Sequence, residues 1–253
     1  MSELYRDTGV VLRTYKLRES DRIVVFHTAE NGKVRAVAKG VRKTKSKFGA
    51  RLEPMSHVRL QLYRGRELDI VTQAESVEPL APMLSSLDRA SQGLAVIEAV
   101  DQLSLEREPN PHLYRMLVGV LRTIATSPPG QAPSSLNVAA FYWKLLANEG
   151  VRPELDQCVR CGASEPDVQF VAFDLNEGGV LCRSCRSGQA ISHEALALLR
   201  HILGGRLRSA LDRDASSATH EVAHLATKAL EFQVQRLRPG CGRCKRQHQC
   251  RPR

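Results

Sequence analysis

Four cysteines lie in two pairs whose spacing suits metal binding. Cys158 and Cys161 form the first pair, and Cys182 and Cys185 form the second after twenty intervening residues. Two residues between paired cysteines allow one tight turn to direct both sulfurs at a single ion, and two such turns complete a tetrahedron. Four thiolates leave no open coordination position, so the pattern predicts one structural Zn²⁺ ion without a catalytic role. Two disulfides or four unrelated buried thiols are the alternatives.

Three further cysteines lie in a basic segment at the C-terminus. Cys241, Cys244 and Cys250, together with His248, have the residue types of a second zinc site. The spacing of the three cysteines also resembles the iron–sulfur pattern of some nucleases. The composition alone favours a third interpretation, which is a disordered basic tail with incidental thiols.

One short motif has the spacing of a zinc protease. His220, Glu221 and His224 match H-E-x-x-H, in which two histidines bind metal and the glutamate acts as general base. On a helix, both histidines would lie opposite the apolar stripe that contains Val222 and Leu225. No third ligand follows at a suitable distance, so the sequence disfavours a protease.

Positive charge is concentrated in one N-terminal stretch. The chain has 253 residues and a net charge of +10, and the segment from 39 to 51 carries six cations and no acid. Cations that converge on one surface bind a phosphate backbone and release its counterions, so we expect a nucleic acid as a partner, with stacking on Phe48 where a base reaches it. A solvated loop that is basic by chance is the alternative. The expected DNA-binding residues are Lys33, Arg35, Lys39, Arg42, Lys43, Lys45, Lys47 and Arg51.

Signatures of enzymes are otherwise weak. The sequence has no phosphate loop, no nucleophile elbow and no dinucleotide-binding fingerprint. Glu67 and Asp69 alternate on an expected strand and would hold magnesium in a nuclease, although an exposed strand face is the simpler interpretation. We therefore expect a protein without catalytic residues. A metal-dependent single-strand nuclease and a zinc-containing transcriptional regulator are the alternatives.

The elements that must position these residues change character near residue 80. Before it, five short apolar or alternating runs predict β-strands, at 10–12, 23–26, 34–38, 58–62 and 68–71. Asn31-Gly32 predicts a tight hairpin between the second and third strands. Five short strands joined by turns predict a small barrel, for which an OB-fold is favoured over an SH3-like barrel.

Beyond Pro82, the apolar residues recur with helical spacing. Leu84, Leu87, Leu94 and Ile97 indicate a first helix, and a second begins with Asn110 as its N-cap. Further helices are expected around residues 138–146, 196–203 and 222–237. The predicted fold class is therefore α+β, with a zinc module inserted into a helical bundle. The expected divisions are an OB-fold domain (1–80), a helical domain in two parts (81–157 and 191–240), the zinc module (158–190) and a basic cysteine-containing tail (241–253).

The sequence also indicates a compartment. The start, MSELYRDTGV, lacks the basic and apolar regions of a signal peptide, and no apolar run approaches the roughly 20 residues of a membrane span. We therefore expect a cytoplasmic, nucleoid-associated protein with reduced thiols and no membrane partner.

Two stretches resemble the bacterial recombination mediator family RecO. They are KGVRKTKSKFGARLEPMSHVRLQLYRGRELDIVTQAESVEPL and FYWKLLANEGVRPELDQCVRCG. The resemblance runs from Thr8 to about Leu237, and the C-terminal cysteines depart from the family's pattern. It implies an N-terminal OB-fold, a helical domain and a zinc module in that order.

The resemblance also implies a function and partners. Such a protein would bind single- and double-stranded DNA and anneal complementary strands. With RecR, it would help to load RecA on strands coated by single-strand DNA-binding protein. In some members, the acidic and apolar C-terminal tail of that coating protein binds the helical domain. The family offers no catalytic residue.

Overall fold

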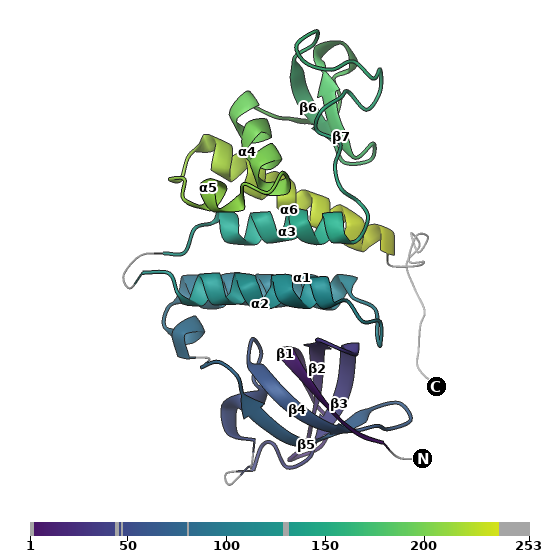
Figure 1. Cartoon of the computed structure of the whole chain (residues 1–253), viewed down its shortest axis with the longest axis vertical. Helices are drawn as coiled ribbons and strands as arrows, with labels where there is room; N and C mark the ends of the chain where they lie inside the picture. The colour runs from purple at the N-terminus through teal and green to yellow at the C-terminus, as the bar shows by residue number, and fades with distance from the viewer. Residues whose placement is uncertain (1–2, 44–45, 47, 80, 129–131, 238–253) are drawn as a thin grey trace, which may run out of the picture.

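The computed structural model describes residues 3–43, 46, 48–79, 81–128 and 132–237. Four parts follow one another along the longest axis (Figure 1). A β-barrel lies at one end, followed by a layer of two helices, a second helical layer, and a small sheet at the other end. The parts thus follow one another in space in nearly the order of the sequence.

The N-terminal part is a closed barrel of five strands. These are β1 (Leu4–Lys16), β2 (Arg22–Thr28), β3 (Gly32–Ala38), β4 (His57–Tyr63) and β5 (Asp69–Ser76), which pair in the order β1-β2-β3-β5-β4. The β3–β5 pair is parallel, while the other pairs are antiparallel. Gly32 has a φ of 63°, as the predicted hairpin requires. The predicted five-stranded barrel is confirmed, and its strand order is that of an OB-fold.

Alternate residues of the strands fill the barrel, which is the period expected of a sheet with one buried face. Val11, Phe26 and Leu60 are among the inward residues. The segment between β3 and β4 adds two residues that are each 1% exposed, namely Phe48, which precedes the short helix η1 (Gly49–Leu52), and Leu52, which ends it. The expectation that Phe48 stacks on a base is therefore wrong, because the ring is a core residue of the barrel.

The outer face of the barrel is buried on one side by α1 (Leu87–Leu103) and α2 (Pro111–Ala125). Three barrel residues belong to the apolar core of the helices and not to the barrel interior, namely Val10, Leu12 and Val25. The same core contains Val96 and Val100 of α1. One continuous core therefore joins the barrel to the helical region.

The first helix buries only one residue of the expected stripe, Ile97, and leaves the leucines of that stripe exposed. Leu87 and Leu94 are 80% and 47% exposed, and Leu84 precedes the helix in η2 (Ala81–Leu84). The buried stripe instead contains Val96, Val100 and Leu103, because α1 faces the barrel on one side and α2 and α3 on another. The second helix begins as expected, since Asn110 Oδ1 accepts a hydrogen bond of 2.9 Å from the Leu113 amide.

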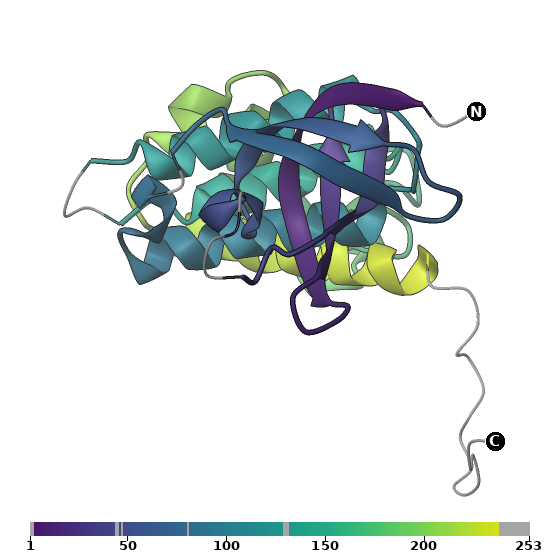
Figure 2. The same ribbon diagram turned by 90° about the horizontal axis from the view of Figure 1, so that it is seen from below.

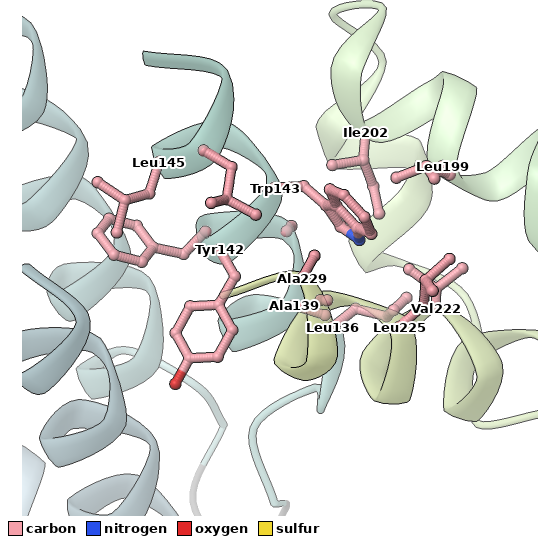
Figure 3. Close-up of a cluster of buried hydrophobic side chains, with 14 of the residues drawn as sticks. Leu136, Ala139, Tyr142, Trp143, Leu145, Leu199, Ile202, Val222, Leu225 and Ala229 are labelled. Atoms are coloured by element: carbon pink, nitrogen blue, oxygen red, sulfur yellow. The ribbon is translucent and has the colours of Figure 1, made fainter. Parts of the chain in front are cut away.

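The second helical layer surrounds one tryptophan. Its helices are α3 (Leu136–Asn148), α4 (His193–Leu203), α5 (Leu207–Leu211) and α6 (Ser217–Leu237). Trp143 of α3 lies among Leu199 and Ile202 of α4 and Val222 and Leu225 of α6 (Figure 3). Among the described residues, no helix is both long enough and apolar enough to cross a membrane.

A small three-stranded sheet lies between α3 and α4 in the chain. It consists of β6 (Phe170–Asp174), β7 (Gly179–Cys182) and β8 (Gln189–Ala190), in the order β7-β6-β8. Phe173 of β6 contacts Trp143 edge to face, with ring centroids 5.8 Å apart. The sheet therefore shares the core of the helices, and it carries the second cysteine pair at the end of β7.

Candidate metal centre and nucleic-acid interface

The first cysteine pair lies on a tight turn. The Gly162 amide donates to the Cys158 carbonyl at 2.8 Å, and the Cys158 amide donates to the Ala163 carbonyl at 2.8 Å. Gly162 has a φ of 75°, a conformation that residues with a Cβ rarely adopt. This turn directs the side chains of Cys158 and Cys161 to the same side.

The second pair lies where β7 gives way to the short helix η3 (Arg183–Cys185). β7 pairs with β6 and ends at Cys182, so the sheet fixes the position of this turn against the first. One sulfur from each of Cys158, Cys161, Cys182 and Cys185 lies within 4.8 Å of all the others. The four cysteines thus form one cluster, and the alternative of unrelated thiols is excluded.

The cluster has the dimensions of a tetrahedral thiolate site. With a Zn–S bond of about 2.3 Å, the sulfurs of a tetrahedron are about 3.8 Å apart. The Sγ atoms of Cys161 and Cys182 are 3.8 Å apart. A disulfide requires about 2.05 Å, and all four cysteines are free, so the disulfide alternative is also excluded. The donor set can bind one metal ion, and it fits zinc.

Metal binding at the cluster would be coupled to loss of protons from the sulfurs. Burial raises the pKa of Cys158, but backbone amides, foremost that of Cys182, lower it more and bring it to about 6. The pKa of Cys185 rises to about 12 because its thiol hydrogen-bonds the neighbouring sulfurs, first Cys161, and because it is desolvated. Without a metal the cluster therefore retains protons, which a bound dication would displace.

Two arginines hold the cysteine turns in place. Arg160 donates to the Cys185 carbonyl at 2.9 Å and to the Ser187 hydroxyl at 3.0 Å, and it pairs with Glu177. Arg200 of α4 donates to the Leu155 carbonyl at 2.6 Å and pairs with Glu165 at 2.9 Å. The first arginine joins the two turns to each other, and the second ties the module to the helices.

The H-E-x-x-H motif has a structural role. His220 and His224 are exposed on α6, as expected. Glu221 accepts hydrogen bonds from the Ser192 amide at 2.6 Å and from the Ser192 hydroxyl at 2.7 Å. The same hydroxyl accepts from the Ala195 amide and caps α4. The glutamate therefore fixes the start of α4 and is not available as a general base.

Glu67 and Asp69, the two acids of the nuclease alternative, differ in solvent exposure. Asp69 has no exposed side-chain surface, whereas Glu67 lies exposed before β5 begins. Asp69 accepts hydrogen bonds from Tyr5 at 2.5 Å, from the Gly65 amide at 3.0 Å and from Arg107 at 2.9 Å. The expectation of an exposed strand face was wrong, because Asp69 is a buried link between the barrel and the helical region.

The basic segment begins beside the β1–β2 hairpin. Lys39, Arg42 and Lys43 are exposed. The Arg42 amide donates to the Ser20 carbonyl at 3.1 Å, and the Gly40 amide donates to Asp21 Oδ1 at 2.8 Å. These bonds fasten the segment to the turn between β1 and β2.

The other expected DNA-binding residues have varied surroundings. Lys33 and Arg35 face the helical region, where Lys33 pairs with Asp101 at 3.3 Å and Arg35 with Glu106 at 3.5 Å. Arg51 is exposed, and its guanidinium donates to the Phe48 carbonyl at 3.3 Å. The remaining expected residues lie outside the described residues, namely Lys45 and Lys47 for DNA and Cys241, Cys244, His248 and Cys250 for a second metal.

The hairpin itself contributes cations that sequence reasoning missed. Lys16 and Arg18 are exposed at the end of β1 and in the turn that follows. The pKa of Asp21 is lowered chiefly by its bond from the Gly40 amide, with smaller contributions from the charges of Arg18 and Lys39. The two basic segments are therefore neighbours around Asp21. The signal available in the sequence was a basic turn between two β runs.

An apolar groove lies on the helical region, between α2, α3 and α5. Its volume is about 290 Å³, and its walls include Met116, Val120, Phe141 and Leu211. Lys144 is the one charged residue of its lining. The groove therefore combines an apolar floor with a single positive charge.

These features define a class of protein. An OB-fold barrel with exposed cations is joined by a continuous core to a helical region that carries a four-cysteine metal site. OB-folds commonly bind oligonucleotides or oligosaccharides, and a basic surface favours the nucleic acid.

Comparison with known proteins identifies the family. The chain matches "Recombination protein O N terminal" over residues 1–80 and "Recombination protein O C terminal" over residues 84–238. A relative from Nocardioides sp. (strain ATCC BAA-499 / JS614), named DNA repair protein RecO, is 40% identical over 239 residues, which cover 92% of this chain and 96% of that relative. The chain belongs to the recombination protein O family, so the resemblance seen in the sequence is confirmed.

Proposed function

We propose that this protein is a DNA-binding recombination mediator in DNA repair. It binds single- and double-stranded DNA and anneals complementary strands without turnover chemistry. With RecR, it helps to load RecA on strands that are coated by single-strand DNA-binding protein. The observation that carries the proposal is a group of unpaired cations at one end of an OB-fold barrel, in a chain that belongs to the recombination protein O family.

The DNA-binding surface follows from which cations form no ion pair with an acid in the described part of the chain. Many cations of the barrel are neutralised, as in the pairs Arg22–Glu53 at 2.8 Å and Arg59–Glu75 at 3.6 Å. In the described part of the chain, no ion pair is formed by the exposed cations around Asp21. These are Lys16, Arg18, Lys39, Arg42 and Lys43, which we name the hairpin cations. Cations without an ion-pair partner break no existing ion pair when they bind a phosphate backbone. Their binding also releases counterions from the DNA, which favours the complex. Arg51, Lys45 and Lys47 extend the same segment.

A role without catalysis is supported by the surroundings of the candidate catalytic groups. Asp69 is engaged by Tyr5 and Arg107, and Glu221 is engaged by Ser192. The cysteine cluster offers four thiolates to one ion, which completes a tetrahedral shell. We therefore propose a single structural Zn²⁺ that stabilises the C-terminal region and takes no part in DNA chemistry.

The groove between α2, α3 and α5 is the proposed docking site for the tail of single-strand DNA-binding protein. An acidic and apolar peptide matches an apolar floor with one cation at its wall. Lys144 has no carboxylate partner among the described residues, so its charge is available to the peptide. RecR, indirect action on RecA and a cytoplasmic, nucleoid-associated location are proposed from family membership.

Annealing is the direct test. Complementary oligonucleotides coated with the cognate single-strand DNA-binding protein should anneal faster with this protein, and annealing should persist in EDTA without loss of strand length. Strand cleavage that depends on magnesium would contradict the proposal in favour of a nuclease. A marked preference for one duplex sequence would instead indicate a transcriptional regulator, because contacts to the backbone carry no base information.

A further inference from the structure

Exposed aromatic rings are rare in this protein. It has one tryptophan, five tyrosines and six phenylalanines, all of which lie in the described part of the chain. Most are buried or half-buried, and Tyr15 and Tyr63 are the two that belong to the exposed large apolar residues, at 45% and 37%. A large part of each of these two rings is therefore accessible to a ligand.

The two tyrosines lie at opposite ends of β1. Tyr15 is the second-last residue of that strand and pairs with Ile23 of β2. Tyr63 ends β4, where it pairs with Leu4 at the start of β1. The β1–β2 hairpin and the β4–β5 hairpin project from different sides of the barrel (Figure 2). Only Tyr15 is therefore near the hairpin cations.

Tyr15 lies on a part of β1 that is held by its neighbours. Its backbone pairs with Ile23 of β2. Arg13, two residues earlier on the strand, pairs with Asp101 of α1 at 3.1 Å. A ring carried by a paired strand loses less entropy than one on a free loop when a flat ligand stacks on it.

A second exposed apolar side chain follows two residues later. Leu17 is 42% exposed and follows Tyr15 by two residues, at the start of the turn. The turn is closed by the bond from the Leu17 amide to the Asp21 carbonyl at 3.1 Å. Asp21 is also the acid that fastens the basic segment through Gly40. The end of β1 and the turn after it thus carry two exposed apolar residues in a region that Asp21 links to cations of two segments.

We propose that Tyr15, at the end of β1, is a base-stacking platform that makes the hairpin cations prefer single-stranded to double-stranded DNA. The inference rests on the proposed DNA-binding function and adds its selectivity. Cations meet the phosphates of either form, but bases in a duplex are already stacked on one another and hidden from a ring on the protein surface. Unpaired bases are free to stack, and stacking tolerates any base sequence because every base has a π-face.

This arrangement separates two contributions to binding. The cations contribute a term that weakens as salt rises, while the ring contributes a term that does not depend on salt. Removal of the ring should therefore lower the affinity for single strands at every salt concentration by the same factor. Removal of the cations should instead change the dependence of affinity on salt for both forms of DNA.

The test compares Tyr15→Ala with Tyr15→Phe and with Tyr63→Ala as the matched control. Dissociation constants are measured for a single-stranded oligonucleotide and for a duplex of the same length, each at two salt concentrations. For Tyr15→Ala we expect about a tenfold loss for the single strand, little change for the duplex and an unchanged salt slope. Tyr15→Phe keeps the ring and should stay near wild type, as should Tyr63→Ala, which removes an exposed ring elsewhere.

A second measurement reports stacking itself. An oligonucleotide that contains 2-aminopurine should lose fluorescence when saturated with wild-type protein, and Tyr15→Ala at saturation should restore part of it. Equal losses for single strand and duplex, or no loss at all, would overturn the stacking role while the DNA-binding function stands. If substitution of the hairpin cations leaves binding to both forms unchanged, it is the proposed DNA surface that fails.

Discussion

Arg107 and Asp69 join the helical region to the barrel through a buried charge. Nη2 of Arg107, in the connection between α1 and α2, lies 2.9 Å from Oδ1 of Asp69 at the start of β5. The Asp69 side chain has no exposed surface, whereas that of Arg107 is 39% exposed. Burial raises the pKa of Asp69, but hydrogen bonds from Tyr5, Arg107 and the Gly65 amide lower it below its usual value. The aspartate is therefore a buried anion that depends on a partner from another part of the chain.

Removal of that partner should destabilise the protein. Arg107→Met leaves Asp69 buried with two neutral donors, and we expect the free energy of unfolding to fall by about 1–3 kcal/mol. The lowered pKa means that Asp69 contributes stability above its unfolded pKa of about 3.9, and that this contribution is lost as pH falls. The difference between variant and wild type, measured by urea unfolding, should therefore shrink below about pH 4. Arg59→Met, which breaks an exposed pair with Glu75, should cost at most about 0.5 kcal/mol.

Loss of one zinc ligand should remove the metal and loosen the C-terminal region. Cys158→Ser leaves three thiolates, so we expect bound zinc to fall by one equivalent and proteolysis to begin within residues 158–190. DNA binding should persist, because the barrel has its own core. Metal content by mass spectrometry, melting temperature and limited proteolysis are the measurements. A full equivalent of zinc and an unchanged melting temperature would contradict the assignment of the four cysteines as zinc ligands.

Cys241→Ser serves as the comparison. A fall in its metal content or a change in colour would indicate a second metal in the tail.

Alanine substitution of the hairpin cations should weaken binding to all DNA sequences alike. Each cation that neutralises a phosphate of a single strand contributes about −0.7 to the slope of log affinity against log salt concentration. If all five make contact, the slope should become less steep by about 3.5 in a titration by fluorescence anisotropy. A control that replaces Arg59, Arg64 and Arg66 also lowers the net charge but should leave most of the slope. Equal effects of the two variants would mean that net charge, and not this surface, determines binding.

Two substitutions should block the groove in different ways. Lys144→Glu reverses its charge, and Gly119→Leu adds a side chain at a position where a Cβ meets no atom within 4 Å. Leucine also favours a helix more than glycine does, so α2 should remain folded. We expect each variant to bind a labelled acidic, apolar tail peptide at least about tenfold more weakly, a change of about 1.4 kcal/mol. Leu94→Ala, on an exposed face of α1, should bind the peptide as wild type does. Unchanged binding by both groove variants would place the tail elsewhere.

Acid should destabilise the protein through His27, which is fully buried between the barrel and the helical region. Burial, followed by the charge of Lys33, lowers its pKa to about 4, although the Asn110 backbone and Asp7 oppose the shift. The folded state thus binds fewer protons than the unfolded state below about pH 6.5, so stability falls from there towards pH 4, by at most about 3 kcal/mol. Urea midpoints at several pH values should show that His27→Leu has a shallower decline than wild type. His220→Leu, at an exposed site, should keep the wild-type decline.

Local pattern was sufficient to predict the five strands of the barrel, the five longer helices and the clustering of four cysteines, but not the sheet of β6, β7 and β8. The alternation of β3, the turn at Gly32 and the cap at Asn110 each depend on residues a few positions apart, and so does each cysteine pair. These features can be recognised in the sequence because the interactions that cause them join residues a few positions apart. The meeting of the two cysteine pairs could be inferred as well, since one ion requires four ligands.

Burial by distant parts of the chain could not be predicted in the same way. Phe48 looked like a loop residue because nothing nearby shows that η1 closes the barrel. Lys33 looked free because its partner, Asp101, lies 68 positions later in α1. Leu87 looked buried because helical spacing cannot tell which stripe of α1 the barrel and the neighbouring helices cover. In each case a contact between remote segments decides the role of the residue.

The edge-to-face contact between Trp143 and Phe173 gives the protein an internal optical reporter. The chain has a single tryptophan, and its indole touches a strand of the sheet that carries Cys182. Intrinsic emission excited near the red edge of protein absorption therefore arises from this one environment, and the barrel contributes none of it. The wavelength of this emission should report the state of the cysteine module without any attached dye. Loss of the metal can therefore be followed in the same sample in which fluorescence anisotropy follows DNA binding.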